Sequence, residues 1–281
     1  MSASSEQKAA PVIEMRGVTV GALRDPEAVV AAEVNWTVAA GDFWVIAGLQ
    51  GAGKSDFLMT TAGLLPARTG DHRLFGEPMP IFEEHRLATR LRLGLVFDGG
   101  QLLNHLTVAE NVALPLRYHR NLAHEEIELA VRAMLEATGL LPWASNTPGT
   151  LPRPWRKRAG LARALMLKPE VLLVDGPLGG LDLRHADWWL GFLDQLAHGQ
   201  ALLDGRSVTL VVTADAFLPW RNHARQFAVL AGQRFSVLSD WAAVERSQLP
   251  AVRALREGRV PEVAQADSSG TEWTPAPGSA K

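Results

Sequence analysis

The stretch GLQGAGKSD, from Gly48 to Asp56, holds the residues whose types and spacing are best suited to chemistry. A glycine, four further residues and then Gly-Lys-Ser form the phosphate-binding pattern G-x-x-x-x-G-K-[ST]. Only glycine lets a backbone wrap closely enough for successive N–H groups to converge on phosphate oxygens. In this pattern the lysine reaches the terminal phosphates and the serine hydroxyl ligates Mg²⁺. The candidate nucleotide-binding residues are therefore Gly48, Gly51, Ala52, Gly53, Lys54, Ser55 and Asp56.

The segments on either side of this stretch are those that a phosphate-binding loop requires. Residues 43–47 are apolar and predict a buried strand, and residues 55–65 carry apolar residues at helical spacing. A strand, a glycine-rich loop and a helix in this order strengthen the interpretation. The alternative is a glycine turn that binds no ligand.

The composition indicates what kind of protein contains this loop. With 281 residues, 47% of them hydrophobic and 21% charged, the chain is expected to be globular, with one large domain or two smaller ones. A net charge of −2 gives no field that would attract nucleic acid, so no nucleic-acid partner is expected. The N-terminus lacks a signal-peptide pattern, and no apolar run approaches the roughly 20 residues that span a bilayer. We therefore expect a cytoplasmic protein that contacts a membrane only through a partner.

The segments before and just after the loop predict a small antiparallel sheet. Residues 1–10 are expected to form a flexible arm. Residues 12–20 and 29–38 are β-branched and partly alternating, which predicts two antiparallel strands joined by a turn at residues 23–27. Residues 69–76 predict a short strand that returns to the sheet edge.

A helical block follows. Residues 93–97 predict a buried strand, after which the pattern changes. Thr107 and Glu110 form a capping-box pattern, and residues 125–138 carry apolar residues on one helical face. Because this block, about residues 100–165, interrupts a chain of strands and helices, it is expected to be an inserted helical subdomain.

The last third of the chain returns to alternating strands and helices. Residues 170–175 predict a parallel strand with an acid at its carboxyl end, followed by a helix over residues 184–198. Residues 207–213 predict another buried strand, and residues 227–238 predict a hairpin. Residues 259–281 are rich in Pro, Ser, Gly and Ala, which predicts a disordered tail.

The fold expected from these elements is α/β. It consists of a P-loop NTPase sheet with an antiparallel β edge and the inserted helical subdomain, in a single domain over residues 11–258.

In their order, these pieces resemble the nucleotide-binding domain of ABC transporters over about residues 12–245. The resemblance implies ATP and Mg²⁺ as ligands, with a membrane permease subunit and a second nucleotide-binding subunit, in a homodimer or a heterodimer, as partners. The phrases LLNHLTVAENVALPLRYH and LPAVRALREG further resemble the ATPase subunit of bacterial MCE-linked intermembrane phospholipid transporters. The segments that carry the family resemblance are GLQGAGKS, LGLVFD with LTVAENVALPL, LPRPWRKRAGLARAL, VLLVDGPLGGLD and VTLVVTAD.

The catalytic positions of the family depart from its pattern. The resemblance places Asp175 in the Mg²⁺ shell, but the following position, a glutamate in the family, is Gly176. The histidine that contacts the γ-phosphate in the family corresponds to Ala214. Loss of a general base lowers rates by about 10²- to 10⁴-fold, and loss of a donor to developing charge by about 10²- to 10³-fold. We therefore expect hydrolysis to be very slow or absent.

The segment that aligns with the family signature LSGGQ also departs. Pro152 has no N–H to offer a phosphate, and Trp155 is bulky where the family site is tight. Arg153 either supplies a compensating positive charge or is solvated. Asp182 either contacts the partner protomer or caps a helix. The surrounding basic cluster, residues 153–163, is interpreted as a solvated helix face rather than a nucleic-acid site.

Two further positions bear on nucleotide binding. Ser55 and Asp175 are candidate Mg²⁺ ligands. Asp98 replaces the family's glutamine and could hold the same ion through a water molecule. Asp56 stands where the family has a threonine at the α-phosphate, and its charge would repel a bound nucleotide. Two alternatives therefore remain. One is a non-enzymatic scaffold or regulatory subunit that has lost nucleotide binding, and the other is a P-loop kinase.

Overall fold

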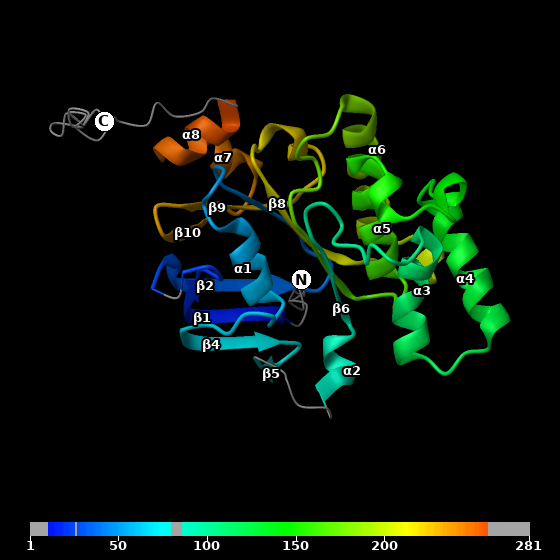
Figure 1. The fold of residues 1–281 in the computed structure, drawn as a ribbon. Helices are drawn as coiled ribbons and strands as arrows, with labels where there is room; N and C mark the ends of the chain where they lie inside the picture. Colours follow the sequence, from blue (N-terminus) through cyan, green and yellow to red (C-terminus); the bar gives the residue numbers. More distant parts are fainter. Residues whose placement is uncertain (1–10, 26, 80–85, 258–281) are drawn as a thin grey trace, which may run out of the picture.

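The computed structural model of the chain describes residues 11–25, 27–79 and 86–257. The predicted arm over residues 1–10 and the predicted tail over residues 259–281 lie outside the described residues. Within those residues, the protein is mixed α/β, with two sheets and a group of helices at one end (Figure 1).

The larger sheet has six strands in the order β10-β9-β3-β8-β7-β6. All neighbouring strands from β9 to β6 pair in parallel, and β10 pairs with β9 antiparallel. Every residue of β3, β7 and β8 is buried, as expected for parallel strands covered on both faces. The strand bounds are Phe43–Ala47 for β3, Leu93–Val96 for β6, Val171–Val174 for β7, Thr209–Ala214 for β8, Gln226–Ala231 for β9 and Arg234–Val237 for β10.

The prediction that residues 93–97 form a buried strand is wrong in one respect. β6 lies at the edge of the larger sheet, and its residues alternate between buried and half-buried. An edge strand has one neighbour, so its exposed side is not covered by another strand.

The smaller sheet is antiparallel, with the order β2-β1-β4-β5. It confirms the predicted hairpin between the first two strands and the return of the third strand to the edge. The bounds are Pro11–Gly21 for β1, Val29–Ala39 for β2, Thr69–Leu74 for β4 and Glu77–Pro78 for β5.

Helix α1, Lys54–Thr61, joins the two sheets through a shared aromatic core. Phe57 on this helix is fully buried and stacks on Phe235 of β10 at 4.8 Å between ring centroids, while Trp36 of β2 lies 5.7 Å from it. The helix ends before residue 65, where the prediction placed its end. Gly63 adopts φ +69° and its N–H donates to Thr60, which closes the helix with a left-handed residue.

The helical block covers one face of the larger sheet. The predicted capping box is present, because Glu110 N donates to Thr107 Oγ1 at 3.2 Å and Thr107 N donates to Glu110 Oε2 at 2.7 Å. Side chains of the block share one core with β3, β7 and β8. The bounds of its helices are Val108–His119 for α3, His124–Ala137 for α4 and Arg153–Leu165 for α5, with short 3₁₀ turns at Leu141–Trp143 and Pro148–Thr150.

The remaining helices lie in the C-terminal half, except α2, which precedes β6. The predicted helix after β7 is confirmed as α6, whereas α2, α7 and α8 had no sequence prediction. No helix in the described residues is both long and apolar enough to cross a membrane. The bounds are Leu87–Arg90 for α2, Leu183–His198 for α6, Trp241–Arg246 for α7 and Pro250–Glu257 for α8, with 3₁₀ turns at Ala201–Leu203 and Leu218–Trp220.

The parallel strands bring three loops together at the carboxyl end of the larger sheet. Ala47 at the end of β3 pairs with Ala214 at the end of β8, and β7 ends beside β8. The loops that follow β3, β7 and β8 therefore begin side by side at the carboxyl end of the sheet, where open α/β sheets bind ligands.

Candidate phosphate-binding site

The loop after β3 has the backbone conformation that its glycines allow. Gly53, the residue before α1, has φ +84°, which a residue with a side chain rarely adopts. A Cβ at this position would also lie 2.5 Å from Val30 Cγ1. The loop therefore approaches β2 so closely that residue 53 must be glycine.

Lys54, the first residue of α1, folds back over the loop. Its Nζ donates to the carbonyl oxygens of Gly48 at 2.7 Å and Leu49 at 2.9 Å. The same ammonium lies 2.9 Å from Asp215 Oδ1, whose side chain is 65% exposed. An anion bound at this lysine would therefore compete with a carboxylate of the same chain.

Ser55 and Asp175 meet across the site. Ser55 Oγ donates to Asp175 Oδ2 at 2.5 Å, and Thr213 Oγ1 donates to Asp175 Oδ1 at 2.7 Å. A hydroxyl and a carboxylate are hard oxygen ligands of the kind that Mg²⁺ takes together with phosphate oxygens. Among the described residues, no three His, Asp or Glu side chains are grouped to hold a metal by themselves. The pair thus fits a Mg²⁺ ion that a bound phosphate helps to coordinate.

These residues line one open cavity of about 480 Å³. Four carboxylates and two cationic side chains face it, so its walls carry an excess of negative charge when all are ionised. The lining residues are Gln50, Gly51, Gly53, Lys54, Ser55, Asp56, Asp98, Arg153, Asp175, Gly176, Gly179, Gly180 and Asp215.

Asp98, the predicted water-mediated Mg²⁺ ligand, lies in the cavity wall but is held by two cations. Arg153 donates to its oxygens at 2.9 and 3.1 Å, and Lys157 Nζ lies 2.9 Å from Oδ1. Partial burial raises the pKa of Asp98, but the bonds from Lys157 and Arg153 outweigh burial and hold that pKa below its usual value. Asp98 is therefore a carboxylate anchored to the helical block.

Lys157, on α5, is buried, although the basic cluster to which it belongs was predicted to be a solvated face. That prediction is wrong for Lys157 and Arg158, which are 1% and 6% exposed. Lys157 Nζ donates to the carbonyl oxygens of Gly176 at 2.6 Å and Gly179 at 2.9 Å. Burial lowers the pKa of Lys157, and the contact with Asp98 opposes that shift. The lysine thus ties α5 to the loop that follows β7.

Arg158 lies among aromatic rings. Its guanidinium carbon lies 3.8 Å from the ring centroid of Trp188 and 4.6 Å from that of Trp155, and Nη2 lies 3.0 Å from His185 Nδ1. Burial lowers the pKa of Arg158 to about 10, with Asp182 acting in the opposite direction. Trp155 is therefore packed within its own chain.

Asp182 caps helix α6. Its Oδ1 accepts a hydrogen bond from His185 N at 3.0 Å, which is the arrangement of a helix N-cap. The geometry accounts for Asp182 without a partner protomer.

The start of α5 presents few backbone donors. Pro152 and Pro154 have no N–H, and the N–H of Trp155 donates to Pro152 O at 3.1 Å. The backbone of residues 152–155 thus leaves Arg153 as the residue with both an N–H and a charged side chain near the cavity.

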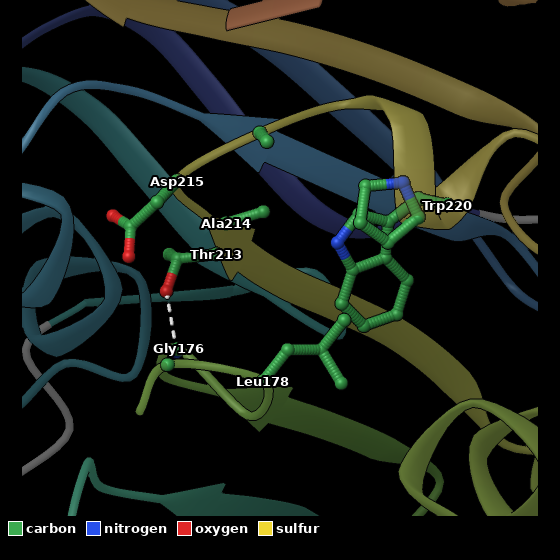
Figure 2. A pocket seen from close by; sticks show the side chains of 9 residues that line it. Gly176, Leu178, Thr213, Ala214, Asp215 and Trp220 are labelled. Carbon is green, nitrogen blue, oxygen red and sulfur yellow. Dashed lines mark hydrogen bonds between the residues drawn. The ribbon is translucent and has the colours of Figure 1, made fainter. Parts of the chain in front are cut away.

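Gly176 and Ala214 border a smaller hollow of about 140 Å³ beside the main cavity. Figure 2 shows Ala214 and Leu178 directed toward Trp220, and Asp215 turned away from that ring. Gly176 N donates to Thr213 Oγ1 at 2.8 Å, and a Cβ on Gly176 would meet no atom within 4 Å. The space beside both positions is therefore open to a longer side chain.

The sequence interpretation missed three residues of this site. Thr213 orients Asp175, Asp215 pairs with Lys54, and Lys157 holds the loop after β7. Two of them had a usable signal, because Thr213 and Asp215 lie at the carboxyl end of a predicted strand and such ends line ligand sites.

Comparison with known proteins places this geometry in a family. The family model described as ABC transporter matches residues 31–179, which is more than half of the chain. A dimeric post-hydrolysis structure of the ATP-binding cassette MJ0796, bound to ADP and Pi, is similar with a TM-score of 0.70 and 25% identity, covering 80% of this chain and 98% of that chain.

Two further solved structures are similar to the chain. A dimeric structure of MJ0796, described as a bacterial ABC transporter cassette, has a TM-score of 0.68 and 26% identity, covering 78% of this chain and 94% of that chain. The protein cbiO1 from Clostridium perfringens, described as part of the ABC transporter complex cbiONQ, has a TM-score of 0.65 and 20% identity. That match covers 80% of this chain and 86% of cbiO1, and at this identity it shows the fold alone.

Proposed function

The chain belongs to the ABC transporter family as an ATP-binding cassette subunit, and we propose that it holds Mg²⁺-ATP while hydrolysing it very slowly or not at all. The observation that carries this proposal is a single cavity. It combines Lys54, Ser55 and Asp175 with Gly176 at the position of the family's glutamate.

The binding half of the proposal rests on groups that the chain retains. Lys54 is positioned at the loop, with its Nζ against Gly48 O and Leu49 O, and would exchange Asp215 for a phosphate oxygen. Ser55 and Asp175 offer oxygens to Mg²⁺, which when bound neutralises phosphate charge. Asp56 opposes binding, so the affinity is expected to be weaker than that of a relative with a threonine there.

The hydrolysis half rests on groups that the chain lacks. Gly176 cannot take a proton from water, and Ala214 cannot donate to a γ-phosphate. Besides Asp56 and Asp175, two carboxylates line the cavity, but Asp215 is paired with Lys54, and Asp98 is paired with Arg153 and Lys157. The cations beside Asp98 hold its pKa below the usual value, so Asp98 is a weak base, and an oxygen of Asp215 faces the ammonium of Lys54. Neither residue is therefore a good substitute for the missing glutamate.

The partners proposed for the chain are a second nucleotide-binding subunit and a membrane permease. The MJ0796 structures are dimeric, which supports the second subunit, and the match to the ABC transporter family supports the permease. The resemblance implies that a cytoplasmic helix of the permease docks near Asp98 and the helical block, and a groove of about 350 Å³ lies beside β6, the strand that leads to Asp98. Its apolar lining residues are Ala62, Leu64, Leu87, Leu91, Leu93 and Leu95.

The transported substrate is proposed to be a phospholipid. The support is the likeness of LLNHLTVAENVALPLRYH and LPAVRALREG to the ATPase subunit of MCE-linked transporters. Purifying the untagged complex from its native membrane and identifying the bound chains and lipids tests this proposal. A permease with no lipid and no MCE protein would contradict it.

Isothermal titration and steady-state turnover of the purified chain test the two halves separately. We expect Mg²⁺-ATP to bind to the unmodified chain and not to Lys54→Ala. We also expect turnover far below that of an intact ABC ATPase. Absence of binding to the unmodified chain would favour the scaffold alternative. Turnover equal to that of an intact ATPase would contradict the proposal that hydrolysis is very slow or absent.

A further inference from the structure

Arg153 reaches the phosphate cavity from the helical block. It is the first residue of α5, and its side chain lines the same cavity as Lys54 and Ser55. Its Nη2 donates to both oxygens of Asp98, and its Nη1 would lie 3.3 Å from a Cβ placed on Gly180. The guanidinium is thus held between two walls of its own chain's cavity.

The excess of acidic side chains in the cavity makes a cation at residue 153 important for binding an anion. Among the described residues that line it, the cationic side chains are Lys54 and Arg153, and the acidic ones are Asp56, Asp98, Asp175 and Asp215. A nucleotide phosphate chain brings further negative charge into this wall. Lys54 lies against carbonyls of the loop after β3, whereas Arg153 is paired with Asp98 in the loop after β6. Lys54 and Arg153 can therefore bind different phosphates of the same nucleotide.

Residues 152–155, the segment that aligns with the family signature, offer an anion a charged side chain rather than a row of backbone N–H groups. The prolines at 152 and 154 remove backbone donors, and Trp155 packs on Trp143 and His185 of its own chain. The group that this segment still offers to an anion is the Arg153 side chain, and it lines its own chain's cavity. A guanidinium can bind two phosphate oxygens at once.

We propose that Arg153 binds the terminal phosphate of the nucleotide held by its own chain's loop, and so makes this site select triphosphate over diphosphate. The inference rests on the proposed nucleotide binding and extends it to the residue that sets specificity. Arg153 leaves one or both Asp98 oxygens to Lys157 when it turns to the phosphate, because Lys157 already contacts Asp98.

The first test compares the affinities for Mg²⁺-ATP and Mg²⁺-ADP by isothermal titration. Arg153→Ala is expected to weaken ATP binding by roughly 10- to 100-fold and ADP binding by less than about threefold, as for the loss of a charged hydrogen bond. Arg132→Gln, which removes an exposed arginine of α4 outside the cavity, is the matched control and should change neither affinity. Equal weakening of both nucleotides, or no change, would overturn the inference. If the unmodified chain binds neither nucleotide, the proposed function fails as well.

A second variant separates phosphate binding from charge balance. Arg153→Ala leaves Asp98 with less compensation, and this alone would repel ATP. We therefore expect the double variant Asp98→Asn/Arg153→Ala to remain as poor at distinguishing ATP from ADP as Arg153→Ala. If the double variant regains the preference of the unmodified chain, Arg153 only neutralises Asp98, and the inference is wrong.

A mixing experiment decides which chain's nucleotide Arg153 contacts. Lys54→Ala provides an intact Arg153 but an impaired loop, and Arg153→Ala provides the reverse. If the contact is within one chain, a dimeric mixture of the two variants does not recover the preference for ATP. Recovery on mixing would show that Arg153 serves the partner's nucleotide, and would overturn the inference. A chain that sediments as a monomer and still prefers ATP supports the contact within one chain directly.

Discussion

The buried ammonium of Lys157 lies 2.6 Å from the carbonyl oxygen of Gly176, the residue that follows Asp175 at the end of β7. The same ammonium contacts Asp98 and Gly179. One side chain of α5 therefore contacts both the loop after β7 and the loop after β6. In this protein, helical block and phosphate cavity are joined by a cation that sequence alone suggested was solvated.

Replacing Lys157 with methionine is expected to destabilise the fold. The change removes the buried ammonium that donates to the carbonyl oxygens of Gly176 and Gly179, a loss of about 2 kcal/mol. The contribution of Asp98 is smaller because that side chain is 48% exposed. Urea unfolding followed by circular dichroism measures the effect. Lys168→Met, which breaks an exposed pair with Asp204, should stay within about 0.5 kcal/mol of the unmodified chain; equal losses in the two variants would contradict a buried anchoring role.

Introducing the two side chains that the proposed function treats as lost is expected to raise hydrolysis. Gly176→Glu places a carboxylate where a Cβ meets no atom within 4 Å, and Ala214→His fills the neighbouring hollow. Gly176 has φ +51°, so the glutamate adds strain of about 1 kcal/mol. Steady-state turnover of the double variant should rise at least about tenfold over the unmodified chain.

Gly176→Ala is the control for this restoration. It adds the same backbone strain and supplies no base, so turnover should not change. If the double variant folds and binds ATP but does not gain turnover, the other residues of the site do not support ATP hydrolysis, and the scaffold alternative is favoured.

Removing the carboxylate that competes for Lys54 is expected to tighten nucleotide binding. In Asp215→Asn the ammonium keeps its contacts with Gly48 and Leu49 but loses its ion pair. Because the Asp215 side chain is 65% exposed, the gain is modest, at most about fivefold in the affinity for Mg²⁺-ATP. Asp204→Asn, on a remote exposed pair, should leave the affinity unchanged. Weaker binding by Asp215→Asn would instead indicate that Asp215 assists the bound metal.

Local sequence patterns predicted the elements that carry strong periodicity. The apolar runs at β3, β7 and β8 and the capping box at Thr107 each follow from neighbouring residues, so the order of elements and the α/β class could be read from the chain. The short helices α2, α7 and α8 have four, six and eight residues, too few to show a helical period clearly.

Contacts between distant segments could not be predicted in the same way. Lys157 appears in the sequence as one of several basic residues on α5, and its burial depends on how that helix packs against the loop after β7. The pairing of Asp98 with Arg153 joins residues that are 55 positions apart. A charge pattern within one helix does not contain this information, because its partners come from other elements.

Acid is expected to destabilise the protein through His72, a residue of β4 that is 4% exposed and whose Nε2 has no hydrogen-bond partner in the described structure. Burial lowers the pKa of His72 to about 4, against the opposing effect of Asp71. The neutral form is favoured in the folded state, so the unfolded chain binds more protons between this value and the ordinary 6.5. The contribution of neutral His72 to the free energy of unfolding is therefore fully present above pH 6.5. It falls by about 3 kcal/mol as the pH decreases toward 4.

His72→Leu removes the titrating group without removing a bond from Nε2. Urea unfolding free energies at pH 7, 6, 5 and 4.5 should fall less steeply for this variant than for the unmodified chain, because its unfolded state no longer gains the proton at residue 72. His124→Gln replaces an exposed histidine of α4 and should keep the original slope. Parallel slopes for His72→Leu and the unmodified chain would mean that the imidazole is already protonated, or hydrated, in the folded protein, and that acid sensitivity arises elsewhere.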